Sequence, residues 1–565
     1  MNISHKWLVP GLLAGLLAGC MQSSRPTADL TPAPQRDPTA ELVFHALAAD
    51  ISARRGLLED AFDHYIWVAR ETEDAAAAEK AARIGLHLRK NGDTLYAASL
   101  WAELAPEDIG AHEVRAAVFL REGRTDEAYT SILAMAELSK EQGSRGFVEA
   151  AGVATAAEDP DAAKSVMARL SRAYPRDTEA RYAHALVLLA FGDITGAERE
   201  ARAAVALDNG NELAWMLLSR IRAQSNEIEE SGAVLEEAVR KNPGSRVLRV
   251  AYGRWLVEMD RYEAAYGQFR RLHAAAPEDP DVLFSLGALA TDLGYWDAAR
   301  GYWKRLMALG ERVDEARYFL AQVEEATGNE DGALALYAGV QDGPLRMEAA
   351  IRRAELLART GRIAEARRVL AEQRVLHPER SIPLYLVEAE ILRENGRPVE
   401  AAQVYDTALQ AFPDDEDLLY ARAMHAAAEA RIEVLERDLR SILKKDPDHA
   451  DALNALGYTL ADQTDRYEEA FELISRALEL KPENAAVLDS MGWVQYRLGN
   501  LDAALDYLRR AAEKDQDSEI AAHLGEVLWV TGRREEALRV WNEALTREPK
   551  SRHVLEAMDR LRTGS

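Results

Sequence analysis

The sequence has very little cysteine, because Cys20 is the single thiol in 565 residues. One thiol excludes an internal disulfide bond and any metal site built from several cysteines. Aromatic residues are also scarce at 7%, whereas 48% of the residues are hydrophobic and 29% are charged. This is the composition of a globular protein and excludes an intrinsically disordered chain.

Basic residues are outnumbered by acidic ones. The chain has 69 Lys and Arg against 95 Asp and Glu, which gives a net charge of −26 at pH 7. Proteins that bind nucleic acid attract the phosphates with clustered Lys and Arg side chains. We therefore expect no nucleic-acid partner.

The N-terminus lacks an apolar stretch long enough to cross a membrane. Trp7 to Gly19 is uncharged for 13 residues, whereas a membrane-spanning helix needs about 20. With Lys6 before it and small residues at its end, the stretch has the pattern of a signal peptide. Leu17-Ala18-Gly19-Cys20 resembles the lipobox of bacterial lipoproteins. The resemblance implies that residues 1–19 are removed, that Cys20 is lipidated, and that this lipid attaches the chain to a membrane.

In the lipoprotein family, an Asp directly after the lipidated cysteine tends to retain the protein in the inner membrane. Here that residue is Met21. The resemblance thus implies the periplasmic face of the outer membrane. Residues 20–40 contain Pro26, Pro32, Pro34 and Pro38, which predicts an extended linker.

A repeat of about 34 residues fills the chain beyond the linker. Most repeats have a turn residue, then an alanine five residues later and a proline at the end of the unit, as at Gly499 and Ala504. The predicted turn residues are Gly56, Gly92, Gly123, Gly192, Asn226, Asp260, Gly294, Gly328, Gly361, Gly396, Asp465, Gly499 and Gly532. Small residues let two antiparallel helices approach closely, and proline ends a helix, so the pattern predicts successive helix pairs.

Over residues 41–549 the pattern resembles tetratricopeptide repeats. The resemblance implies an all-α solenoid, a right-handed superhelix of about fifteen helix pairs. Residues 550–565 are predicted to be a capping helix over the last repeat. The pattern is weak at 137–161 and at 426–433, where the repeat boundaries stay open.

Motifs of catalysis were not found, since the chain has no phosphate-binding Gly loop, no His-Glu-x-x-His and no Gly-x-Ser-x-Gly. Adjacent acids stand where second helices begin, a position at which the helix dipole favours negative charge, as at Glu229-Glu230, Glu468-Glu469 and Glu535-Glu536. We therefore expect no enzyme, no catalytic residue, no cofactor and no metal site.

The last repeats contain a candidate protein-binding groove. Their first helices place large aromatic and polar side chains at positions that turn away from the second helices. The predicted groove residues are Asn454, Tyr458, Asp462, Asp489, Trp493, Tyr496, Arg497, Glu526 and Trp529. The alternative is that the rings fill the gaps between adjacent first helices as core.

Residues 488–497 and 520–529 are similar to a group of tetratricopeptide lipoproteins of Gram-negative bacteria that includes the adaptor of a carboxyl-terminal processing protease. The resemblance implies a periplasmic scaffold that presents peptidoglycan hydrolases to that protease. The alternative function is an assembly or pilot lipoprotein for a pilus, a polysaccharide exporter or an outer-membrane secretion system.

Overall fold

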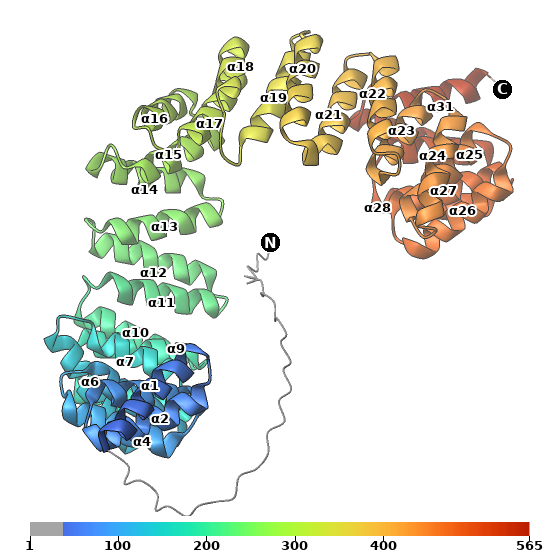
Figure 1. The fold of residues 1–565 in the computed structure, drawn as a ribbon. Coiled ribbons are helices and arrows are strands. Elements are labelled where there is room, and N and C mark those ends of the chain that lie inside the picture. The colour runs from blue at the N-terminus through green and yellow to red at the C-terminus, as the bar shows by residue number, and fades with distance from the viewer. Residues whose placement is uncertain (1–37, 564–565) are drawn as a thin grey trace, which may run out of the picture. The chain divides into compact units, whose positions relative to one another are not determined.

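The computed structural model describes residues 38–563, which form 31 α-helices joined by short turns (Figure 1). Within this range there is no strand, so the all-α prediction is confirmed. Consecutive helices pack in antiparallel pairs and α31 is left over, as expected for about fifteen pairs. The predicted signal peptide, Cys20 and most of the predicted linker lie outside the described residues. No helix between residues 38 and 563 combines the length and the apolar character needed to cross a membrane.

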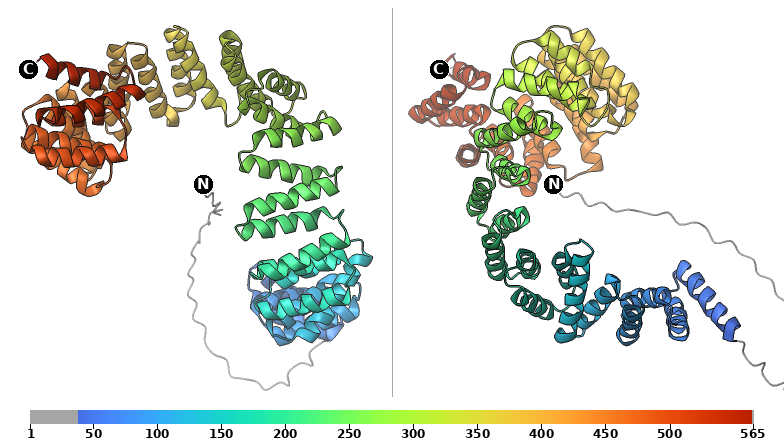
Figure 2. Two further views of the ribbon diagram at one scale, coloured as in Figure 1. Left: turned by 180° about the vertical axis from the view of Figure 1, so that it is seen from behind. Right: turned by 90° about the vertical axis from the view of Figure 1, so that its left-hand side faces the viewer.

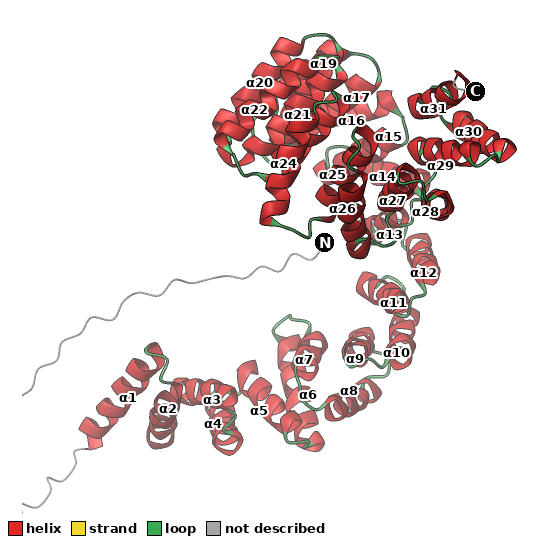
Figure 3. Ribbon diagram, turned by 90° about the vertical axis from the view of Figure 1, so that its right-hand side faces the viewer, coloured by secondary structure: helices red, strands yellow, loops and turns green. Residues whose placement is uncertain are grey.

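The described residues divide into two compact units, unit 1 up to Tyr252 and unit 2 from Gly253 on, with the division inside α13. The helices up to the division are α1 (Pro38–Arg54), α2 (Leu58–Thr72), α3 (Ala75–Leu88), α4 (Asn91–Leu104), α5 (Ile109–Arg121), α6 (Thr125–Glu141), α7 (Gly146–Thr155), α8 (Pro160–Ala173), α9 (Thr178–Ala190), α10 (Ile194–Leu207), α11 (Glu212–Gln224), α12 (Ile228–Lys241) and α13 (Arg246–Glu258). Odd-numbered helices are the first helices of the pairs. In unit 1 they form one layer and the even-numbered second helices form the other (Figure 3).

The second unit continues the same alternation, and its helices pack against their neighbours in the chain, as the left view of Figure 2 shows for the green helices at its start. Its helices are α14 (Tyr262–Ala275), α15 (Pro280–Asp292), α16 (Trp296–Ala308), α17 (Val313–Ala326), α18 (Glu330–Ala338), α19 (Arg346–Arg359), α20 (Ile363–Leu376), the 3₁₀ turn η1 (Pro378–Arg380), α21 (Ser381–Glu394), α22 (Pro398–Ala411), α23 (Glu416–Ala428), α24 (Ile432–Lys445), α25 (Ala450–Gln463), α26 (Tyr467–Leu480), α27 (Ala485–Arg497), α28 (Leu501–Lys514), α29 (Ser518–Val530), α30 (Arg534–Arg547) and α31 (Arg552–Thr563).

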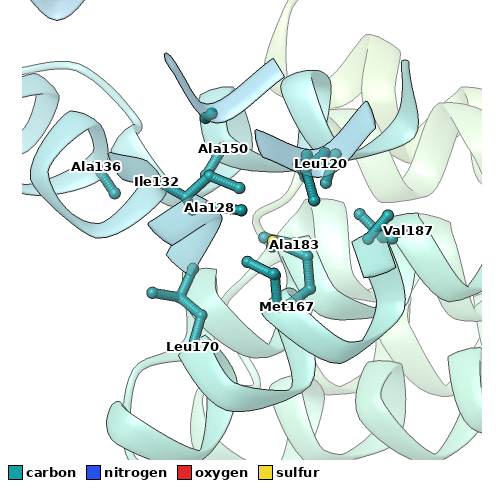
Figure 4. Close-up of a cluster of buried hydrophobic side chains, with 14 of the residues drawn as sticks. Leu120, Ala128, Ile132, Ala136, Ala150, Met167, Leu170, Ala183 and Val187 are labelled. Atoms are coloured by element: carbon teal, nitrogen blue, oxygen red, sulfur yellow. The ribbon is translucent and has the colours of Figure 1, made fainter. Parts of the chain in front are cut away.

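Alanines five residues after the turns hold the two helices of each pair together. These side chains are 0% exposed at Ala61, Ala128, Ala197, Ala265, Ala299, Ala333, Ala366, Ala401, Ala470, Ala504 and Ala537. Because a methyl group is all that separates the backbones there, larger side chains close the space around the crossing. Figure 4 shows one such cluster in unit 1, where Ile132, Met167 and Leu170 surround Ala128.

Most of the predicted turn residues lie in turns between helices, as expected, but the prediction for Gly92 is wrong. Gly92 lies inside α4, whereas Arg89 takes the left-handed conformation with φ 60°. The backbone N–H groups of Arg89 and Lys90 bond to carbonyls of the last turn of α3. Since this closes α3 early, α4 begins at Asn91 and includes the glycine.

The two stretches in which the sequence repeat is weak, 137–161 and 426–433, each contain a turn between two helices. Gly143, with φ 82°, separates α6 from α7, which has ten residues. Ala430, with φ 53°, takes the glycine's place between α23 and α24. The repeat therefore continues through both stretches.

The two ends of the described range differ slightly from the predicted boundaries. Residues 38–40, expected in the linker, form the first turn of α1, where proline is tolerated because its missing N–H would have no helical partner. At the other end, Val554 and Met558 of α31 are buried against the cluster that includes Leu524 and Val527 of α29.

Candidate functional site

The predicted groove residues lie on α25, α27 and α29, the first helices of three consecutive pairs. Each helix is set against its second helix by a glycine. A Cβ added at Gly525 would lie 2.1 Å from Nε1 of Trp541, and one at Gly492 would lie 2.5 Å from Cγ of Leu508. These close approaches fix the rotation of the first helices, so Trp493 and Glu526, one residue further on, face away from the second helices by about 100°.

Trp493 fills the space between α27 and α29. Its side chain is 3% exposed and stacks on the ring of His523, with centroids 4.2 Å apart and an interplanar angle of 23°. The centroid of the Tyr496 ring lies 5.2 Å from that of Trp493, at an interplanar angle of 47°. The core alternative therefore describes Trp493 better than an open groove position does.

Tyr458 connects α25 to α29, two pairs further along the chain. Its hydroxyl donates to Oε1 of Glu519 at 2.6 Å and lies 3.4 Å from Nε2 of His523. The other ring nitrogen of His523, Nδ1, is 2.9 Å from Oδ2 of Asp489. Tyr458, Glu519, His523 and Asp489 thus form one continuous chain of contacts across three first helices.

Burial and charge act together on this chain of contacts. Burial, followed by the charge of Glu519, raises the pKa of Tyr458. For His523, burial favours the neutral ring, but the charge and hydrogen bond of Asp489, together with the charges of Glu519 and Asp462, outweigh it and raise the pKa. His523 and Asp489 are both less than 9% exposed, and the pairing with Asp489 keeps the proton on His523 to a higher pH than on a free histidine.

The remaining predicted residues surround this centre. Tyr496 donates to Glu526 at 3.4 Å, and Glu526 also pairs with Arg560 of α31. Arg497 donates to the main-chain oxygen of Asp462 at 3.1 Å and lies over the ring of Tyr467.

Asn454 and Trp529 contact none of the other predicted groove residues through a described hydrogen bond or ring contact. Oδ1 of Asn454 is buried and accepts no hydrogen bond from residues 38–563. Trp529 is half-buried, with its centroid 5.8 Å from that of Trp541 and the guanidinium of Arg534 over its ring.

The structure thus brings together five of the nine predicted residues, Tyr458, Asp489, Trp493, Tyr496 and Glu526. Sequence reasoning missed His523 and Glu519, which connect them. One signal was present, since His523 occupies a position at which the preceding first helices have the smaller Ala455 and Ser490. Binding of a partner by these residues stays a prediction.

Among residues 38–563, His, Asp and Glu side chains form no group of three or more that could hold a metal ion. Within the candidate site, Tyr458, Glu519, His523 and Asp489 are joined by hydrogen bonds and an ion pair, and Glu526 pairs with Arg560.

Comparison with known proteins places this arrangement in a family. Tetratricopeptide repeat models match residues 150–212, 188–251, 347–372, 384–416, 417–485, 463–524 and 519–543. The TPR repeat-containing protein PA4667 of Pseudomonas aeruginosa is 34% identical over 533 residues, which cover 90% of this chain and 88% of that protein. The TPR repeat-containing protein MJ1428 of Methanocaldococcus jannaschii is 33% identical over 103 residues, 18% of each chain.

A solved structure, the thermophilic TPR protein TTC0263 of Thermus thermophilus, shares 25% identity over 32% of this chain and 96% of its own, with a TM-score of 0.29. The long match to the Pseudomonas protein extends across both units. Repeats of this kind bind other proteins through the exposed faces of their stacked helices. The chain belongs to the tetratricopeptide repeat family and is a scaffold for protein–protein interactions.

Proposed function

We propose that this scaffold is a lipoprotein, anchored through Cys20 on the periplasmic face of the outer membrane, that gathers periplasmic proteins and catalyses no reaction itself. One observation carries the scaffold role: helix pairs of one kind follow one another from α1 to α31. The anchor rests on the Leu17 to Cys20 segment. One acyl chain alone binds membranes only marginally, with a constant of about 10⁴ M⁻¹, so several chains on Cys20 give a durable attachment.

Within this role, the partners are a carboxyl-terminal processing protease and the peptidoglycan hydrolases that it cleaves. The support is the similarity of residues 488–497 and 520–529, most of α27 and α29, to that adaptor group. A scaffold that holds enzyme and substrate together converts their encounter into an intramolecular one, at an effective concentration in the millimolar range. The gain in cleavage rate then needs no catalytic group on the scaffold.

The test is chemical cross-linking in cells, followed by capture of the native lipoprotein and identification of the cross-linked proteins. We expect a processing protease together with peptidoglycan hydrolases. A set made of pilus, polysaccharide-export or outer-membrane assembly proteins would replace this proposal with the alternative function.

The Cys20→Ala variant tests the anchor separately. We expect it to leave the membrane fraction, or to remain uncut, while its helical content is unchanged. A variant that still fractionates tightly with the outer membrane would show that Cys20 is not the anchor.

A further inference from the structure

Unit 1 has an open hollow between three of its first helices. The hollow lies between α3, α5 and α7, has a volume of about 480 Å³, and is within the size range of ligand pockets. Its floor is apolar, with Leu86, Ile109, Met135 and Val153 contributed by four different helices.

The hollow exists because α7 is short and has a glycine, Gly152, on the wall that faces it. This helix has ten residues, whereas the first helices on either side, α5 and α9, have 13 each. A Cβ added at Gly152 would meet no atom within 4 Å, so the glycine leaves open space on the wall of the hollow. Beneath it, Met135 is 1% exposed and belongs to the core cluster shown in Figure 4, which supports the floor.

The rim of the hollow is acidic. Glu158 pairs with Arg89 and lies 3.7 Å from Arg121, so these charges compensate one another. Glu113 and Glu149 are both exposed, and neither has a cationic partner among residues 38–563. An apolar floor beside two uncompensated carboxylates fits an apolar side chain that is followed by a positive charge.

We propose that this hollow, the unit 1 pocket, is a docking site for an extended peptide segment of a partner protein that carries a large apolar side chain next to a lysine or arginine. The apolar side chain enters between α5 and α7, and the cation lies at Glu113 and Glu149. The site lies far in sequence from residues 454–529, and it does not depend on whether Cys20 is lipidated.

The first test measures binding of fluorescent peptides to the detergent-solubilised full chain. The probes are short Gly/Ser peptides with a central Phe-Lys, and matched peptides with Phe-Glu or Gly-Lys. We expect the Phe-Lys peptide to bind about tenfold more tightly than either control. Its affinity falls as salt rises from about 0.1 M to about 1 M, because the screening length shrinks from about 10 Å to about 3 Å. Equal binding of all three peptides would overturn the proposal.

A second test fills the unit 1 pocket with a large side chain and compares this variant with a matched control. Gly152→Trp places an indole in the open space and is expected to weaken Phe-Lys binding about tenfold or more. Gly267→Trp is the control, since Gly267 of α14 is also helical with no atom within 4 Å of an added Cβ, and it lies in the other unit. Unchanged binding by Gly152→Trp, with melting temperatures equal to the control, would refute the proposed pocket.

Charge reversal keeps the test decisive if the tryptophan variant fails to fold. Glu113 and Glu149 are exposed, and replacing both by Lys reverses the charge of the rim. Because Oε2 of Glu149 accepts a hydrogen bond from the buried hydroxyl of Ser139 at 2.6 Å, the single Glu113→Lys variant, which leaves that bond in place, is measured beside it. We expect this double variant to prefer the Phe-Glu peptide over the Phe-Lys peptide. An unchanged preference would contradict the assigned role of the two carboxylates.

A photoreactive side chain at Ala156, on the exposed rim, identifies the occupant. Cross-linking to the Phe-Lys peptide, suppressed by excess unlabelled peptide, supports the proposal. In the absence of peptide, capture of residues 1–37 of the same chain, or of a second copy, would assign the hollow to that occupant instead and overturn the proposal.

Discussion

Replacing Trp493 by alanine separates packing from partner binding at the candidate site. The side chain is 3% exposed, so nearly its whole surface is removed from water in the folded chain. A tryptophan buries roughly 150–250 Å², and at about 25 cal/mol per Å² this burial stabilises the fold by about 4–6 kcal/mol. The stacked contact with His523 contributes about 0.5–1.5 kcal/mol more. Because alanine keeps part of this burial and the surroundings partly relax, we expect Trp493→Ala to destabilise the surrounding repeats by about 3–5 kcal/mol, the usual cost of such a truncation.

Trp493→Phe is the matched control, because it keeps an aromatic ring against His523. Nε1 of Trp493 has no hydrogen-bond partner among the described residues, so the phenylalanine leaves no acceptor unsatisfied. Urea denaturation followed by circular dichroism gives the stability, and amide hydrogen exchange in α25–α31 localises the change. A Trp493→Ala variant with wild-type stability but reduced capture of partners would refute the packing argument and restore Trp493 to an open groove.

Three further predictions concern stability. Ala430→Gly is expected to stabilise the chain by about 0.5–1 kcal/mol, because the left-handed conformation costs alanine about 1–2 kcal/mol and the greater freedom of glycine in the unfolded chain offsets part of that gain. A urea denaturation midpoint below that of the wild type would contradict this. Gly525→Ala should cost about 1–3 kcal/mol by overpacking against Trp541, whereas Gly152→Ala, in open space, should not destabilise. The raised pKa of His523 adds stability that is complete below the ordinary value of 6.5 and is lost as pH rises through the raised value. The difference in midpoint between wild type and His523→Gln should therefore shrink toward alkaline pH, and a constant difference would rule this out.

The repeat could be predicted from sequence because its rules are local. An alanine five residues after a turn, such as Ala504 after Gly499, forces a close helix crossing whatever surrounds it. Gly92 was misassigned because a glycine near a helix boundary does not show on which side of the boundary it lies, and the hydrogen bonds of Arg89 decide that.

The candidate site was predictable only in part, because its geometry depends on the spacing between first helices. The position of Gly492 predicts in which direction the side chain of Trp493 points from α27. The ring that stacks on it, His523, belongs to α29 of the next helix pair, and the sequence does not give the distance between the two helices. The unit 1 pocket could not be predicted either. Its apolar residues lie on different helices, and the hollow depends on what Gly152 leaves unfilled.

The contact of Tyr458 with Glu519 and His523 skips one repeat, and this affects how the last repeats unfold. In an array in which each repeat touches only its neighbours, free energies add pair by pair and the ends can fray one unit at a time. A bond between residues 61 positions apart adds a next-nearest-neighbour coupling. Fraying of α29 then removes an interaction of α25 as well, so we expect the repeats from α25 to α29 to unfold more cooperatively than an array with neighbour contacts alone.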